Sequence, residues 1–426
     1  MVASKASATA VPMGARRDLT LVSRRRVLVL ASTFPRWAGD TEPPFIFNLC
    51  RSLRHAFDFT VLAPHAAGAR TIEQMDGLSV HRFRYFWPAG AQRLAYGGML
   101  PNLKRNPWLW FQAPFFMAAE LVEAIRLIRS EDIDVIHAHW LLPQGLVAAI
   151  AGLLTGRPVV LTTLGADVYG LQGKWTSRIK RWVLRRMTRI TALSRDLAQA
   201  VEGLADSERE PVAVIGLGVD THRFKSRRDA RAFRAKLGLN GPMLLFVGRL
   251  AEKKGVRYLL AAMPAVLAQH PNATLVIIGD GPLRGELTLQ ARDLGLGESV
   301  RFLGARQAKE LPNFYTAADA FAGPSIVAAG GDTESFGVVF AEAMACGCPV
   351  VASDVGGVSD LVKHERTGLM VPQRDPDALA QALCRLLEDE GLARRLRRNG
   401  RAHVKRHFSE AAIAENYETV LREAAA

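Results

Sequence analysis

The stretch ESFGVVFAEAMACGCPVVASDVGG, residues 334–357, predicts a loop, then a helix, then a buried strand. A Ser-Phe-Gly turn separates two carboxylates, Glu334 and Glu342, that stand eight positions apart. The free backbone N–H groups at the start of such a helix bind a diphosphate without needing a metal ion. A carboxylate on each side can accept hydrogen bonds from hydroxyl groups, one on a sugar and one on a ribose. We therefore expect a nucleotide-sugar site here.

Length and composition indicate a globular protein with two domains. The 426 residues suffice for two separate cores, and 49% of them are apolar. Four cysteines are scattered along the chain: Cys50, Cys346, Cys348 and Cys384. The close pair at 346 and 348 is too near for a relaxed disulfide and lacks the companion ligands of a zinc site. We expect free, buried thiols in a reducing cytosol.

The charge of the chain is uneven. Residues 1–215 carry 27 Lys and Arg against 17 Asp and Glu, whereas residues 216–426 carry 28 against 24. A basic front half suits an anionic membrane surface or an anionic acceptor. No recognition module for nucleic acid is present, so no nucleic-acid partner is expected. The longest apolar run, residues 145–154, is about half the length of a transmembrane helix. We expect a cytoplasmic protein that can rest peripherally on the inner membrane face.

Short apolar strands alternate with longer helical patterns, which predicts parallel α/β sheets. The first series of predicted strands comprises residues 27–31, 59–62, 135–138, 159–162 and 189–192. The second comprises residues 243–247, 274–278, 300–303, 320–322 and 349–352. Two series predict an α/β fold of two doubly wound, Rossmann-like domains that face each other across a cleft, where ligands bind.

The linker between the two domains is predicted near Gly216-Leu217-Gly218. An N-terminal, acceptor-binding domain then spans residues 23–215, and a C-terminal, donor-binding domain spans residues 216–405. Residues 406–426 include a long amphipathic helix that is expected to cross back. Residues 1–22 are interpreted as a flexible basic tail. The following VLVLAS run is interpreted as a buried strand, because it is too short for a signal peptide and no cleavage site follows.

Two loops of the back half carry candidate ligands. In FVGRLAEKKGV, residues 246–256, Arg249 and Lys254 follow a strand and precede a helix. Such a loop faces the cleft, so the two cations can grip one diphosphate; the alternative is a pair of solvated surface charges. GDGPLRG, residues 279–285, matches a dinucleotide fingerprint only weakly, because Pro282 interrupts it and no acidic partner follows, so NAD is not expected. Gly281 there is either part of a tight turn or part of a glycine wall for a nucleotide.

Together these motifs resemble the retaining glycosyltransferases of family four, which have the GT-B fold. The resemblance rests on Gly248-Arg249, Lys254-Gly255, Gly279-Asp280-Gly281-Pro282, Glu334-Ser335-Phe336-Gly337 and Glu342-Ala343-Met344-Ala345. It covers residues 210–400 closely and the front half more loosely. It implies transfer of a hexose-type sugar from a nucleoside-diphosphate sugar, with retained anomeric configuration. It implies no metal and no cofactor besides this donor, and a lipid-linked, polysaccharide or other glycan acceptor.

The resemblance also implies roles for individual residues. Glu334 holds the donor sugar, Arg249 and Lys254 hold the diphosphate and stabilise the leaving group, and Glu342 holds the ribose. A departing nucleoside diphosphate develops negative charge, which preorganised cations and amides stabilise. The remaining predicted donor-binding residues are Gly39, Gly248, Gly281, Ser335, Phe336, Gly337 and Val338.

The front half matches the family pattern incompletely. In TFPRWAGDTEPPFI, residues 33–46, only Gly39 stands where the family often has two adjacent glycines. This loop contacts the donor through Gly39, reads the acceptor through Arg36 and Asp40, or is an ordinary connection; the sequence leaves these alternatives open.

A second departure lies in TTLGADVYG, residues 162–170. It resembles the family's Thr-x-His-Gly-x-Asp segment but has Leu164 in place of the histidine, to which the family gives a role at the reaction centre. Either His139, at the end of another strand, substitutes for that histidine, or the backbone alone makes the contact. Asp167 matches the pattern and is expected to orient an acceptor hydroxyl.

Three further segments bear on metal binding and membrane contact. Residues 132–134, Asp-Ile-Asp, fit a metal motif by letters but precede a strand, on the far side from the cleft, so no metal site is expected. The basic helix at 174–187 and the aromatic stretch at 85–116 are expected to rest on an anionic leaflet. The alternative for the helix is a core position with a solvated basic face.

Two other functions are compatible with the same fold. One is a sugar-nucleotide epimerase or hydrolase, which would turn over the donor with no acceptor present. The other is a non-catalytic subunit that binds a nucleotide sugar, for which Leu164 is the main argument.

Overall fold

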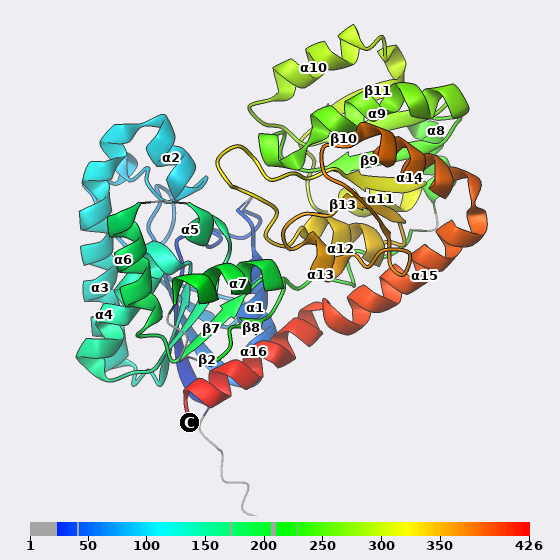
Figure 1. Ribbon diagram of the computed structural model, residues 1–426. Coiled ribbons are helices and arrows are strands. Elements are labelled where there is room, and N and C mark those ends of the chain that lie inside the picture. The colour runs from blue at the N-terminus through cyan, green and yellow to red at the C-terminus, as the bar shows by residue number, and fades with distance from the viewer. Residues whose placement is uncertain (1–23, 41, 171–172, 206–209, 228) are drawn as a thin grey trace, which may run out of the picture.

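The computed structural model describes residues 24–40, 42–170, 173–205, 210–227 and 229–426, so the tail predicted at 1–22 lies outside the described residues. The chain forms two lobes, each built on a mainly parallel sheet with helices packed against it (Figure 1). The predicted fold class, two doubly wound α/β domains, is confirmed.

The N-terminal lobe holds an eight-stranded sheet in the order β3-β4-β2-β1-β5-β6-β7-β8. Only the β3–β4 pair is antiparallel. The strands are β1 (Arg25–Leu30), β2 (Phe57–Pro64), β3 (Ile72–Met75), β4 (Leu78–Phe83), β5 (Val135–His139), β6 (Val159–Thr163), β7 (Arg189–Ala192) and β8 (Ala213–Val214). The C-terminal lobe holds a six-stranded parallel sheet in the order β11-β10-β9-β12-β13-β14. Its strands are β9 (Met243–Val247), β10 (Thr274–Ile278), β11 (Val300–Gly304), β12 (Ala320–Gly323), β13 (Val350–Ser353) and β14 (Leu369–Val371).

Helices pack against these sheets in both lobes (Figure 1). Those of the first lobe are α1 (Phe45–Leu53), α2 (Met99–Arg105), α3 (Gln112–Ser130), α4 (Leu146–Thr155), α5 (Ala166–Tyr169), α6 (Lys174–Leu184) and α7 (Arg195–Leu204). Those of the second are α8 (Ala230–Lys236), α9 (Val256–Gln269), α10 (Arg284–Asp293), α11 (Leu311–Ala317), α12 (Val338–Ala345), α13 (Val358–Leu361), α14 (Pro376–Glu388) and α15 (Glu390–His407), and α16 (Glu410–Ala424) ends the chain. Short helical turns are η1 (Ala89–Ala91), η2 (Pro107–Phe111), η3 (Leu141–Gly145), η4 (Glu252–Lys254) and η5 (Gly297–Ser299).

All the predicted strands are present. Most are apolar runs buried within a parallel sheet, whereas β11, at the edge of its sheet, is mostly half-buried. The strands that the sequence did not reveal are β3, β4, β8 and β14. They lie in short edge segments or in the β3–β4 hairpin, where such a run is lacking. The four cysteines are free and buried, as predicted. Among the described helices, none combines the length and apolar character that crossing a bilayer requires.

The chain crosses between the lobes twice, at adjacent points. Val219, in the first crossing, donates its N–H to the carbonyl of Phe408 at 2.8 Å, and its carbonyl accepts from Glu410 at 3.2 Å. After this second crossing α16 returns and packs on α1 of the N-terminal lobe (Figure 1). Tyr417 of α16 is buried against β6, where its hydroxyl lies 3.4 Å from that of Thr162. The predicted return of residues 406–426 therefore has a specific docking surface.

One acidic side chain of the first lobe is buried without an opposite charge. Glu120 of α3 is 0% exposed, and Nε2 of Gln144 lies 3.4 Å from each of its carboxylate oxygens. Burial raises the pKa of Glu120 to about 8. Because the pKa is higher in the folded than in the unfolded chain, this group favours folding below about pH 4.5, and that contribution is lost as the pH rises through about 8.

Glu120→Gln is expected to flatten the pH dependence of stability. The uncharged amide keeps the shape of the side chain and removes the cost of ionising it. Between pH 5 and pH 9 the variant should therefore gain roughly 2–4 kcal/mol relative to the original chain. Chemical denaturation at several pH values measures this. Glu123→Gln is the matched control, since Glu123 lies on the same helix in an ion pair with Arg126 that lowers its pKa. Parallel pH profiles for Glu120→Gln and the original chain would contradict the argument.

Candidate functional site

The loop before α12 presents unused backbone donors. Gly337 precedes the helix with φ of +83°, and a Cβ there would lie 2.7 Å from Phe340, so the turn requires glycine. Within the described part of the chain, the N–H groups of residues 335–338 donate to no acceptor. They lie at the positive end of the helix dipole, where an anion is stabilised.

A buried ion pair closes this loop. Lys254, the last residue of η4, donates from Nζ to Oε2 of Glu334, and the two side chains are 16% and 12% exposed. Burial alone would raise the pKa of Glu334, but the Lys254 cation outweighs it, so the pKa is lowered and the carboxylate is charged at neutral pH. Arg249, in the same loop as Lys254, is exposed and has no hydrogen bond or ion pair from its side chain to any described residue. An unused cation therefore stands beside a paired one.

Glu342 lies further along α12 and faces another partner. The hydroxyl of Tyr315, a residue that the sequence did not single out, donates to Oε2 of Glu342 at 2.9 Å. Burial raises the pKa of Glu342 to about 7, although the Tyr315 hydrogen bond works against this shift. The Tyr315 hydroxyl therefore orients the Glu342 carboxylate on the helix that follows the unused amides.

The glycines of the two nearby loops serve packing between the loops. A Cβ on Gly281 would lie 2.7 Å from the N atom of Leu250, and the carbonyl of Asp280 accepts from the Leu250 N–H at 2.9 Å. A Cβ on Gly248 would lie 3.2 Å from the ring of Phe246 and 3.7 Å from Cε of Lys254. The close approach of Leu250 favours the tight-turn alternative for Gly281, and a side chain at position 248 would crowd the ring of Phe246.

The two lobes touch at the α12 loop. A Cβ on Gly165, which has φ of +107°, would overlap Oγ of Ser335 and lie 2.8 Å from its Cβ. Below this contact, the N–H of Arg195 donates to Asp360 at 2.6 Å, and Nε of Arg195 lies 3.0 Å from the same carboxylate. The ring of Phe336 packs 5.5 Å from that of Phe408 at the second crossing. The predicted donor loop is thus held against the N-terminal lobe.

Two predicted catalytic side chains are buried in the N-terminal lobe. His139 is 1% exposed, its ring lies 4.2 Å from that of His137, and burial lowers its pKa well below the usual value. Asp167 is 6% exposed, and its carboxylate accepts from the N–H groups of residues 141, 164 and 165 at 2.7–3.1 Å. Asp167 already accepts three backbone hydrogen bonds, and His139 lies beneath the protein surface. Contact of either side chain with a sugar stays a prediction.

The loop after β1 is fixed by its own side chains. Arg36 forms a bidentate ion pair with Asp40, with distances of 2.8 and 2.7 Å, and its guanidinium lies 4.6 Å from the ring of Trp37. The two residues are therefore engaged with each other rather than turned toward an acceptor. Gly39 is exposed, with φ of +80° and open space around it, so its backbone remains accessible.

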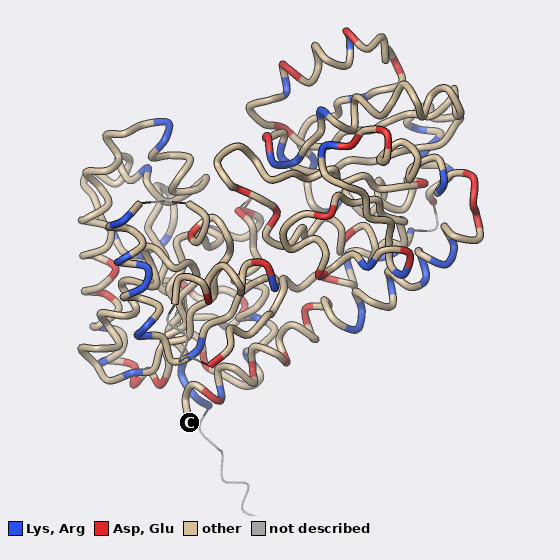
Figure 2. Tube along the Cα trace, in the orientation of Figure 1, with Lys and Arg blue, Asp and Glu red and all other residues tan. Residues whose placement is uncertain are grey.

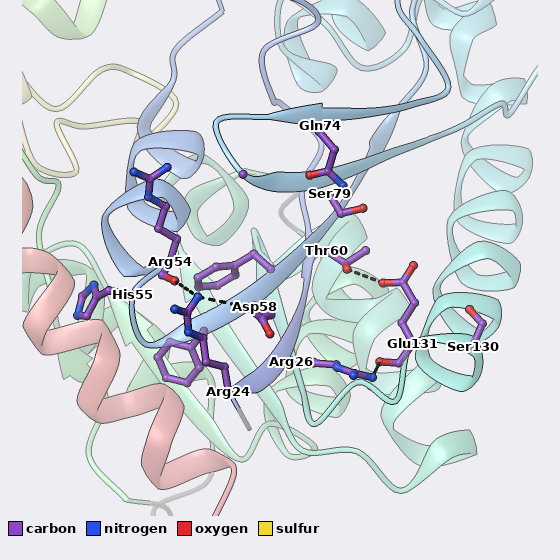
Figure 3. Close-up of a pocket in the computed structure, with 13 residues that line it drawn as sticks. Arg24, Arg26, Arg54, His55, Asp58, Thr60, Gln74, Ser79, Ser130 and Glu131 are labelled. Atoms are coloured by element: carbon purple, nitrogen blue, oxygen red, sulfur yellow. Dashed lines mark hydrogen bonds and ion pairs between the residues drawn. The ribbon is translucent and has the colours of Figure 1, made fainter. Parts of the chain in front are cut away.

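A polar pocket of about 700 Å³ lies at the amino ends of β1 and β2 (Figure 3). Its polar and charged groups are partnered within the pocket: Thr60 donates to Glu131 at 2.6 Å, and Arg24 lies 3.7 Å from Asp58. Ligands of doubly wound sheets bind at the carboxyl ends of the strands, so this pocket is not the donor site.

Nearby, Asp132 is exposed and 3.7 Å from Arg26. Across the described residues, no three His, Cys, Asp or Glu side chains gather as a metal site.

Comparisons with known proteins match both halves of the chain to described families. Residues 228–403 match the family described as glycosyl transferases group 1, and residues 45–223 match glycosyltransferase family 4. The chain is 33% identical to a GDP-mannose-dependent alpha-(1-6)-phosphatidylinositol monomannoside mannosyltransferase of Mycobacterium tuberculosis, over 93% of this chain and 98% of that protein.

Other relatives and solved structures extend the picture. The chain is 31% identical to an uncharacterized glycosyltransferase of Methanocaldococcus jannaschii, over 70% of this chain and 78% of that protein. Among solved structures it resembles sucrose-phosphate synthase of Thermosynechococcus elongatus, with a TM-score of 0.73, 25% identity and coverage of 94% and 99% of the two chains. Anabaena HepE in complex with UDP and glucose shares the fold, with a TM-score of 0.72, 24% identity and coverage of 94% and 100%.

Proposed function

The chain belongs to the group 1 glycosyl transferases of family four, and from that premise we propose that it transfers a hexose-type sugar from a nucleoside-diphosphate sugar to a lipid-linked or other glycan acceptor. We further propose retention of the anomeric configuration, no requirement for a metal ion, and action at the cytoplasmic face of a membrane. The observation that carries this proposal is the buried Lys254–Glu334 pair beside the unused amides of residues 335–338.

The chemistry follows from these groups. The donor diphosphate lies against the amides, with Arg249 and Lys254 as counter-charges, and Glu334 and Glu342 accept from sugar and ribose hydroxyls. As the bond between the sugar C1 and the phosphate oxygen breaks, the cations and amides stabilise the charge on the leaving group. The acceptor oxygen bonds to C1 on the same face, and its proton passes to the departing phosphate oxygen. No side-chain base is needed, which fits the burial of His139 and Asp167.

The first test is a thermal-shift panel with EDTA present. It uses UDP, GDP and ADP and their conjugates with glucose, mannose, galactose and N-acetylglucosamine. GDP-mannose is the first donor to try, because the mannosyltransferase relative is similar over nearly the whole chain. A ligand at 100 times its dissociation constant adds about 2.7 kcal/mol of stability. One nucleotide series should stabilise the protein, and Lys254→Ala should abolish that shift.

The matched control is Lys253→Ala. Lys253 is the adjacent cation and pairs with Asp332 at 3.0 Å, but this pair is 28% and 53% exposed. Its removal should leave the nucleotide shift intact. If no nucleotide stabilises the original chain, or if both lysine variants lose the shift equally, the proposed donor site is wrong. Turnover of the donor without any acceptor would favour the epimerase or hydrolase alternative, and binding without release of nucleoside diphosphate would favour a binding subunit.

The membrane contact is proposed on one side of the N-terminal lobe. Trp108 and Phe111 of η2 are 76% and 65% exposed and stack at 5.7 Å, and Trp175 of α6 is 76% exposed. Lys104 and Arg105 of α2 and Lys174 and Arg178 of α6 are exposed on the same lobe, whose backbone is shown in Figure 2. Large exposed aromatic rings flanked by cations are typical of surfaces that rest on an anionic leaflet.

Reversible binding to anionic vesicles is the expected result. Each nearby cation contributes about 1 kcal/mol at low salt, and screening by salt should release the protein. The double change Trp108→Ser and Trp175→Ser should lower the bound fraction about tenfold in vesicle co-sedimentation. Leu153→Ser is the control, since Leu153 is 61% exposed near the end of α4. A protein that ignores anionic vesicles at low salt would contradict this contact.

A further inference from the structure

The N-terminal lobe contains an apolar pocket that the donor site does not use. Its volume is about 350 Å³, within the range of small-molecule sites. Side chains of α2, α3, η3 and α4 line it, among them Leu103, Phe116, Met117, Leu142 and Leu146. Leu103 and Phe116 belong to the buried core, whereas Met117, Leu142 and Leu146 are only half-buried. Apolar walls that the protein does not fill suit an apolar occupant.

One end of this pocket lies at the cleft. Ser32 and Thr33 directly follow β1, and Ala166 and Asp167 begin α5, so all four stand at the carboxyl edge of the sheet. Ala166 is the next residue after Gly165, which touches Ser335 of the donor loop. This end of the pocket is therefore formed next to the contact between Gly165 and the donor loop.

The other end lies at the outer aromatic surface. Trp110 of η2 and Ile179 of α6 line the pocket and are 51% and 40% exposed. Ile179 stands one helical turn after Trp175, so the two side chains share a face of α6. Trp108 and Phe111 flank Trp110 in η2. The pocket thus connects the reaction cleft with the surface proposed to rest on the membrane.

We propose that this pocket holds a hydrocarbon chain of the acceptor lipid while the acceptor's sugar hydroxyl reaches C1 of the donor. The inference rests on the proposed function, since it names the class of acceptor. A continuous apolar passage from membrane to cleft keeps the chain out of water while its polar head reacts. The cations near the outer end, Lys104, Arg105, Lys174 and Arg178, match an anionic head group or its neighbours in the leaflet.

The test measures binding of n-alkyl α-mannosides, from butyl to dodecyl, in water below their micelle concentrations. Trp110 and Trp140 line the pocket, so their fluorescence reports occupancy. Affinity should rise about fourfold for each added methylene and then level off when the pocket is full. Ala113→Trp, on the wall formed by α3, should remove most of this dependence. Val122→Trp is the control, because Val122 lies on the same helix and is 68% exposed.

Met117→Trp provides a second filling variant in case Ala113→Trp does not fold, and the melting curve of each variant shows whether it folds. The proposal is overturned if the filling variants keep the chain-length dependence of the original chain. It is also overturned if they lose vesicle binding in parallel, because the chain would then rest on the outer surface. Failure of the proposed function is separate: it shows as no nucleotide-induced thermal shift, whatever the alkyl mannosides do.

Discussion

Glu334→Ala is expected to lower the rate of sugar transfer by at least about a hundredfold, while the dissociation constant of the free nucleoside diphosphate changes by less than about threefold. Glu334 is assigned to the donor sugar, so its contact acts on the transition state and is absent from complexes with the nucleotide alone. The Glu334 carboxylate neutralises Lys254. Removing the carboxylate leaves that cation free for the diphosphate, so nucleotide binding has no reason to weaken.

Initial transfer rates and calorimetric titration with the free nucleoside diphosphate measure the two quantities. Asp332→Ala is the matched control. Asp332 stands two positions before Glu334 and pairs with the neighbouring cation, Lys253, but its side chain is largely exposed. It should leave both quantities within about twofold, as expected for a surface ion pair. Equal losses of transfer and nucleotide binding in Glu334→Ala would show that Glu334 only keeps the loop folded.

Gly165→Ala is expected to lower the transfer rate about a hundredfold with only a modest loss of thermal stability. The added Cβ would overlap Oγ of Ser335 where the two lobes meet. The donor loop must then move away from the N-terminal lobe, and a misplacement of about 1 Å in an active site can cost a factor of about 100. The positive φ adds local strain of roughly 1–2 kcal/mol.

Two variants separate the clash from the strain. Gly156→Ala places a Cβ at another positive φ, +71° at the end of α4, with nothing within 4 Å. It should cost stability but not transfer. Ser335→Gly removes the side chain that clashes with the Cβ of Ala at position 165, and it keeps the backbone N–H. Combining it with Gly165→Ala should therefore restore most of the transfer rate. A double variant as slow as Gly165→Ala alone would show that the lobe contact is not the cause.

Much of the donor site could be predicted from the sequence because its parts are local. The turn at 335–337 precedes an apolar helix in the chain, and Arg249 and Lys254 follow a strand that reads as a buried run. Residues that are close in sequence stay close in space. The amides of the turn and the two cations therefore lie at the carboxyl edge of the sheet. Which groups pair there required the fold: Lys254 reaches Glu334, 80 residues later, because β12 pairs with β9 in the sheet.

In the front half, the burial of the candidate site residues could not be predicted from the sequence. The rings of His137 and His139 lie 4.2 Å apart on one face of β5, and the sequence could not show that both rings are covered. Tyr417 of α16, from the end of the chain, packs 5.7 Å from His137. The matching letter at Asp167 likewise did not show that backbone N–H groups already occupy its carboxylate.

The sequence by itself determined the two doubly wound domains, the family and the chemical character of the donor loop. These depend on apolar runs, turn residues and helix ends that lie within a few tens of residues of one another. Only the tertiary structure decided which side chains are buried, which lobe contacts the donor loop and where an apolar passage remains. Burial and cavities depend on how segments distant in the chain pack together, and local periodicity carries no record of that packing.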